Sequence, residues 1–173
     1  AMSNYHRVLY LRKAQNKKLK TFECYFNLSQ AYKRINFDSS LLYIDKAIGL
    51  YPDKLNSRIQ RLNILGHYNK IDVNDFNDID RVINIENKVN QSIATFYWIK
   101  SSYLFKTKDY VKSLKYAEMS YDFFRENNFL KESLQCIELI SNIFEKQKNY
   151  KSAFVFKKLE KKYSDSLIKI SAR

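Results

Sequence analysis

Residues 137–165 read IELISNIFEKQKNYKSAFVFKKLEKKYSD, two amphipathic stretches joined by a short polar segment. Ile137, Ile140 and Phe144 are spaced i, i+3 and i+7, which is the spacing of the face that a helix buries. The joining residues are few, so the second stretch has to return alongside the first. The segment therefore predicts an antiparallel helical hairpin.

The same pattern recurs at 24–53 and at 96–123, with a weaker copy at 54–88. In each clear copy the first stretch ends in an aromatic residue: Tyr32, Tyr103 and Phe144. A small residue then follows three positions after a second aromatic residue: Ser40, Ser113 and Ala153. We expect the three terminal aromatic residues to be largely buried, because each closes the apolar stripe of its helix.

The composition favours an all-helical chain. The 173 residues include only two glycines and one proline, but 14 tyrosines and 12 phenylalanines. Tight β-turns and phosphate-binding loops require glycine, so the composition argues against an all-β fold and a glycine-rich nucleotide site. A hydrophobic fraction of 45% is sufficient for a packed core. No run approaches the ~18 apolar residues of a membrane-spanning helix.

The repeated spacing resembles the tetratricopeptide repeat (TPR) family. In the first copy the matching positions are Tyr25, Leu28, Ser29, Tyr32, Phe37, Ser40, Ala47 and Pro52, and in the last they are Ile137, Ile140, Ser141, Phe144, Tyr150 and Ala153. The leucine-like positions Leu28, Leu65, Ile99 and Ile140 are 37, 34 and 41 residues apart, whereas the family unit has ~34 residues. Lys100 occupies the small-residue position of the third copy. The resemblance implies an all-α, TPR-like solenoid.

The resemblance also implies a division of the chain into about four hairpins and a leading helix. We interpret the segments as a leading helix from a truncated repeat (1–20), TPR-like repeats (21–53, 90–128 and 129–165), a degenerate repeat (54–89) and the start of a connector (166–173). The chain stops at Arg173 within a charged stretch, and we expect further sequence to follow it.

The net charge of +13 is concentrated at the two ends of the chain. Residues 1–20 and residues 145–173 each carry +6, whereas the residues between them carry +1. A nucleic-acid-binding surface would gather its charge in one stripe, often with stacking aromatic residues among the basic ones. This distribution argues against direct nucleic-acid binding by this segment.

The sequence offers little for catalysis or metal binding. His6 and His67 are the only histidines, and Cys24 and Cys136 are the only cysteines, which we interpret as reduced core residues. The acidic segment IDVNDFNDID (71–80) fails as a calcium loop counted from Asp75, because Ile79 occupies the fifth position, where an oxygen ligand is needed, and Asp80 occupies the sixth, where glycine is needed. Its acids are better explained as the start of a helix with Asp72 or Asn74 as the N-cap. We therefore expect no enzyme activity, cofactor or metal.

In TPR proteins the first helices of the hairpins line a groove that holds peptides. The resemblance implies that the groove residues here are Phe26, Gln30, Lys33, Tyr97, Ser101, Leu104, Glu138 and Asn142. Phe26 and Gln30 do not match the lysine and asparagine clamp with which some family members hold chaperone tails. A chaperone cofactor is therefore disfavoured, and capture of a peptide by aromatic side chains stays open.

The expected function is a non-catalytic protein- or peptide-binding array. The tail at 149–173 resembles the last repeat of bacterial TPR signalling proteins of Bacteroidetes type, which implies the sensor or interaction region of a signalling or transcriptional regulator. A stand-alone adaptor scaffold and a helical-repeat RNA binder are the alternatives. Homodimerisation stays open, and the compartment is undetermined: the cytoplasm is slightly favoured, and a periplasmic location would need a membrane-spanning helix after the array.

Overall fold

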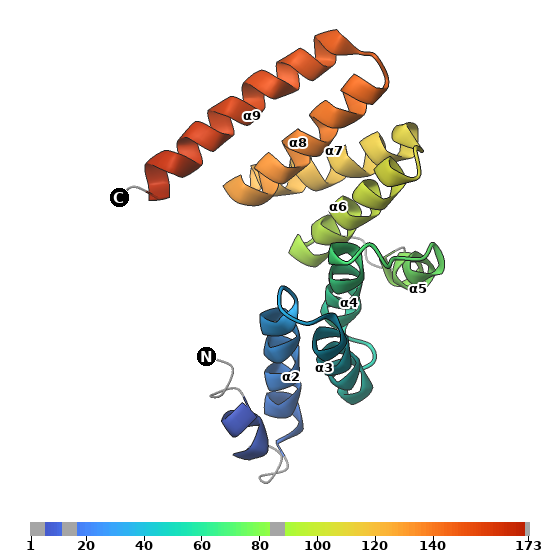
Figure 1. Ribbon diagram of the computed structural model, residues 1–173, viewed down its shortest axis with the longest axis vertical. Helices are drawn as coiled ribbons and strands as arrows, with labels where there is room; N and C mark the ends of the chain where they lie inside the picture. Colours follow the sequence, from blue (N-terminus) through green and yellow to red (C-terminus); the bar gives the residue numbers. More distant parts are fainter. Residues whose placement is uncertain (1–5, 12–16, 84–88, 172–173) are drawn as a thin grey trace. The chain divides into compact units, whose positions relative to one another are not determined.

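The computed structural model describes residues 6–11, 17–83 and 89–171, and these residues are helical with no β-strand among them (Figure 1). Residues 6–11 form a short helical segment. The longer helices are α2 (Lys18–Tyr32), α3 (Phe37–Leu50), α4 (Leu55–His67), α5 (Asn74–Ile83), α6 (Gln91–Lys106), α7 (Tyr110–Glu126), α8 (Leu130–Lys146) and α9 (Tyr150–Ser171). None of them combines the length and the apolar character that a bilayer crossing requires.

The chain divides into two compact units, the first ending at Val82 and the second beginning at Ile83. In the first unit α2 and α3 form a hairpin, and α4 packs against α3. Leu28, Ile44, Ala47 and Ile64 form the fully buried centre of the core around this hairpin. The core of the first unit therefore draws on the apolar faces of three successive helices.

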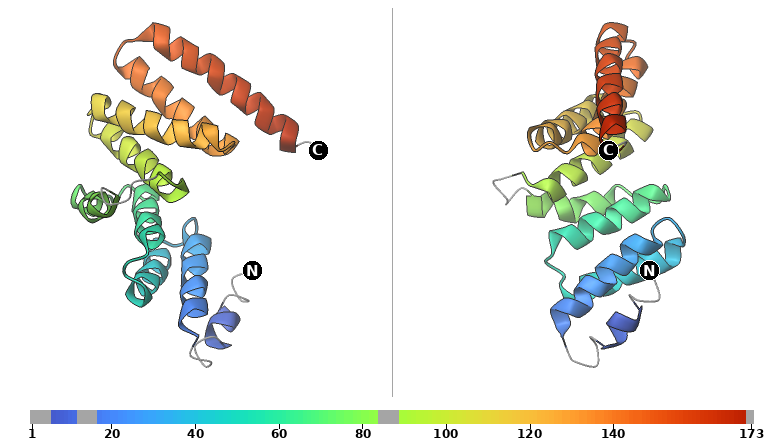
Figure 2. Two further views of the ribbon diagram at one scale, coloured as in Figure 1. Left: turned by 180° about the vertical axis from the view of Figure 1, so that it is seen from behind. Right: turned by 90° about the vertical axis from the view of Figure 1, so that its left-hand side faces the viewer.

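The second unit contains two hairpins, α6–α7 and α8–α9, with α7 packed against α8 (Figure 2). One buried cluster joins Ala94, Phe124 and Cys136, and a second joins Ala117, Ile140 and Ile143. Antiparallel packing of successive helices was predicted from the short polar turns. The arrangement of these hairpins as a TPR-like solenoid stays a prediction.

Four helices end in a left-handed residue that is not glycine: Asn69, Lys108, Asn128 and Lys148. At the end of α6 the amide of Lys108 donates to the carbonyl of Phe105 (3.1 Å), and the amide of Asp109 donates to that of Leu104 (2.9 Å). These two bonds define a Schellman motif, which usually places glycine at the left-handed position. The described glycines Gly49 and Gly66 lie instead inside α3 and α4.

Buried serines fasten the two helices of a hairpin to each other. The hydroxyl of Ser101 in α6 donates to the carbonyl of Ser113 in α7 (2.7 Å), and the hydroxyl of Ser113 donates to the carbonyl of Ser101 (2.9 Å). Ser40 donates to the carbonyl of Ser29 in the same way in the α2–α3 hairpin (2.8 Å). The small residue of the third hairpin is therefore Ser101, and its assignment to Lys100 was wrong by one position.

The expected burial of Tyr32, Tyr103 and Phe144 was also wrong, because all three are only half-buried. Each lies near the C-terminal end of its helix, and the rings of Tyr32 and Phe144 pack on one ring of the following helix, Tyr43 and Phe156 respectively. Full burial belongs to aliphatic residues one or two turns earlier, such as Leu28 and Ile140.

Two boundaries expected from the sequence differ from the helix boundaries in the structure. Residues 18–20 belong to α2 rather than to the leading helix, and residues 166–171 continue α9 rather than begin a separate connector. The remaining parts of those two segments at 1–5, 12–16 and 172–173 lie outside the described residues, as do residues 84–88 of the degenerate repeat.

Candidate functional site

The groove residues expected on α2 share one face of that helix. Phe26, Gln30 and Lys33 are spaced i, i+4 and i+7, with Gln30 exposed and the other two half-buried. On α8, Glu138 and Asn142 are both exposed and lie one turn apart. These five residues are available to a ligand on their own helices.

The residues expected on α6 are largely enclosed. Ser101 is fully buried against Ser113, and Tyr97 is buried with its ring 5.7 Å from that of Tyr116. Leu104 is half-buried. Ser101 aligns with Ser29, so the positions on α6 that correspond to Phe26 and Gln30 are Trp98 and Ser102. Tyr97 and Ser101 thus face the interior of their hairpin.

Lys33 contacts a residue that sequence reasoning missed. Its Nζ donates to Oδ1 of Asn63 in α4 at 2.8 Å, which links the C-terminal end of α2 to α4. Burial lowers the pKa of the Lys33 ammonium, and the adjacent positive charge of Arg34 lowers it further. Asn63 precedes Gly66 by three positions, as Phe26 precedes Ser29, and that shared spacing could have identified it.

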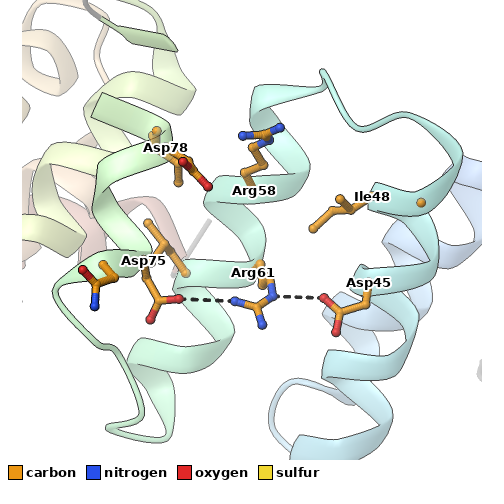
Figure 3. A pocket seen from close by; sticks show the side chains of 10 residues that line it. Asp45, Ile48, Arg58, Arg61, Asp75 and Asp78 are labelled. Carbon is orange, nitrogen blue, oxygen red and sulfur yellow. Dashed lines mark hydrogen bonds and ion pairs between the residues drawn. The ribbon is translucent and has the colours of Figure 1, made fainter. Parts of the chain in front are cut away.

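A hollow of about 570 Å³ lies between α3, α4 and α5 (Figure 3). Arg61 of α4 occupies one side of it, where its Nε donates to Asp45 of α3 at 3.0 Å and its Nη1 donates to Asp75 of α5 at 3.4 Å. Figure 3 shows the guanidinium of Arg61 between the two carboxylates. The side chain of Arg61 therefore links three successive helices through ion pairs.

The acidic segment 71–80 forms the start of α5, as predicted. The Oδ1 atom of Asp72 accepts the amide of Asn74 at 2.9 Å, and Oδ2 of Asp75 accepts the amide of Asp72 at 2.8 Å. The prediction missed that Asp75 also pairs with Arg61. Within the described parts of the chain, no three His, Cys, Asp or Glu side chains converge as metal ligands would.

Both cysteines are buried free thiols. The Sγ atom of Cys136 lies 3.4 Å from Oγ of Ser120, and burial raises the pKa of this thiol to about 12. A nucleophilic cysteine needs a lowered pKa and an accessible sulfur, so Cys136 is a packing residue.

No known protein family matches the chain, and neither a curated protein nor a solved structure matches it. The resemblance to TPR proteins therefore depends on the quoted residues alone.

Proposed function

We propose that this chain is a non-catalytic protein- or peptide-binding array of TPR type, serving as the sensor or interaction region of a bacterial signalling or transcriptional regulator. The observation that supports peptide binding best is the state of Lys33. Its ammonium is half-buried, its hydrogen-bond partner is the neutral amide of Asn63, and no carboxylate of the described residues pairs with it.

A partly desolvated cation gains more from a carboxylate than from an amide. The bond to an amide already has an ionised donor, but a carboxylate adds the attraction between two opposite charges, and loss of water around the ammonium strengthens that attraction. A peptide carboxylate beside Lys33 would restore the stabilisation that burial removes. The side-chain NH₂ of Asn63 supplies further donors for the same group. Phe26, two turns earlier on α2, offers an aromatic contact for the rest of the peptide.

The test uses the whole chain and a library of synthetic dodecapeptides with free C-terminal carboxylates. Retained peptides are sequenced, resynthesised and titrated against wild type, Lys33→Met and the control Lys20→Met, which changes an exposed lysine of the same helix. We expect affinity to fall at least tenfold in Lys33→Met, equivalent to about 1.4 kcal/mol, and to be unchanged in the control. Failure to retain any peptide, or equal binding by Lys33→Met, would contradict the proposal.

The regulator part of the proposal is tested separately, by the coding sequence that follows Arg173. A helix-turn-helix or kinase domain there supports a regulator. A stop codon at that point favours the adaptor scaffold instead.

A further inference from the structure

Two of the charged side chains that line the hollow between α3, α4 and α5 take no part in the ion pairs within it. Arg61 is neutralised by Asp45 and Asp75 on either side. The two remaining charged residues that line the hollow are Arg58 on α4 and Asp78 on α5. In Figure 3 the carboxylate of Asp78 points toward α4, the helix that carries Arg58.

Arg58 is held in place without its charge being neutralised. Its Nε donates to the carbonyl of Pro52 at 3.0 Å, which fixes the guanidinium while the terminal nitrogens keep their donors. A carbonyl oxygen carries no net charge. Arg58 is therefore positioned to receive a carboxylate with little loss of side-chain freedom.

Asp78 has a weak partner. Its carboxylate lies 3.6 Å from Nη1 of Arg81, and the two side chains are 70% and 80% exposed. Ion pairs this exposed contribute little to stability, because water screens them and two flexible side chains must be ordered. A basic group entering the hollow can replace Arg81 at small cost.

The hollow also has apolar walls and free space. Ile48, Leu62 and Ile79 contribute to its lining. Gly49 lies beside them, and a Cβ added there would meet no atom within 4 Å. Three carboxylates and two arginines line the hollow, a net charge of −1 that disfavours a phosphate backbone. A volume of about 570 Å³ is suited to several side chains of a peptide.

We propose that this hollow binds a peptide segment of mixed charge, with an acidic side chain on Arg58, a basic side chain on Asp78 and apolar side chains against the apolar walls. The site shares no residue with the Lys33–Asn63 pair, so it is a second peptide surface beyond the proposed function. Either site can fail while the other persists.

The test titrates the full chain with four capped nonapeptides that share flanking residues and carry Glu-Leu-Leu-Lys, Lys-Leu-Leu-Glu, Glu-Leu-Leu-Gln or Gln-Leu-Leu-Lys at the centre. Fluorescence anisotropy reports affinity. We expect one of the two doubly charged peptides to bind at least tenfold more tightly than either singly charged peptide. Equal affinity for all four, or equal binding of free glutamate or lysine, would overturn the proposal.

Charge reversal in the protein gives the decisive comparison. Arg58→Glu combined with Asp78→Arg should reverse the preferred order of the peptides, since the two anchoring side chains exchange sign. The control Lys20→Glu with Glu23→Arg makes the same exchange at exposed positions of α2 and should leave the order unchanged. Asp78→Asn, an exposed and mild change, should abolish the preference for the basic residue. An unchanged preference in a folded variant overturns the proposal.

Discussion

Lysine at a left-handed backbone position has a steric cost that glycine avoids. Lys108 and Lys148 have φ values of 66° and 61°, and each occupies the turn between the two helices of a hairpin in the second unit. The Cβ atom of an L-residue crowds its own carbonyl there, at a cost of roughly 1–2 kcal/mol. Replacement by glycine recovers only part of that cost, because glycine makes the unfolded chain more flexible and so increases the entropy that is lost on folding.

Lys108→Gly and Lys148→Gly should therefore each stabilise the second unit by about 0.5–1 kcal/mol. The measurement is the free energy of unfolding from urea titration followed by circular dichroism. Lys115→Gly, an exposed position within α7, should destabilise the protein by about 1 kcal/mol. A loss of stability at the two turn positions would show that the lysine side chains make contacts that outweigh the backbone strain.

The thiol of Cys136 should be inert while the protein is folded. With a pKa of about 12, only about one thiol in ten thousand is ionised at pH 8. The thiolate is the reactive form, so its fraction grows only as the pH approaches 12. Labelling with Ellman's reagent at pH 8 should be slow for the native chain and rapid for both cysteines in urea. Native labelling at the denatured rate would contradict the burial of the thiols.

At the scale of the helices, the serine pair of α6 and α7 should behave as a coupled unit. Each hydroxyl donates to the other residue's carbonyl, so Ser101→Ala and Ser113→Ala each remove one bond between the helices. Each should cost about 0.5–1.5 kcal/mol. The double-mutant cycle should give a coupling energy of at least about 0.5 kcal/mol.

Ser102→Ala is the matched control for this cycle. Its hydroxyl donates to the carbonyl of Trp98 within α6 and crosses to no other helix (2.9 Å). Its effect on the free energy of unfolding should stay within about 0.5 kcal/mol. A cost as large as that of Ser101→Ala would show that the bond between helices contributes no more than a serine hydrogen bond within one helix.

Aliphatic residues, rather than the terminal aromatic ones, should dominate the stability of the α8–α9 hairpin. Ile140 is fully buried, whereas Phe144 is half-buried with its ring 5.6 Å from that of Phe156. Ile140→Ala should cost about 2–5 kcal/mol and exceed the cost of Phe144→Ala. Urea titration of the two variants compares them directly, and the reverse order would place the core on the aromatic side of α8.

The α2–α3, α6–α7 and α8–α9 hairpins were predictable from the sequence because both the apolar stripe and the polar turn are local features. The third hairpin was misaligned because Lys100, Ser101 and Ser102 are consecutive and two are small, so that only burial distinguishes them. The hollow could not be predicted, since Asp45, Arg61 and Asp75 meet only once three helices have packed. Local spacing carries no information about that arrangement.

At the scale of the whole molecule, each unit has a core of its own. The clusters around Cys136 and Ile140 draw only on residues of the second unit. Residues 83–173 expressed alone should therefore remain helical and unfold cooperatively, as monitored by circular dichroism at 222 nm during heating. A weak helical signal, or a gradual transition without a midpoint, would show that the unit needs residues of the first.

The packing of each helix against its neighbour in sequence also affects how the chain folds during synthesis. The extensively packed pairs of described helices are neighbours in sequence, so each contact joins segments that leave the ribosome in succession. A hairpin such as α6–α7 can close as soon as its second helix has emerged, before α8 has been synthesised. Nascent chains stalled at successive lengths should gain protease resistance in steps of one hairpin. This order of synthesis keeps each apolar face exposed for only the time needed to translate the next helix.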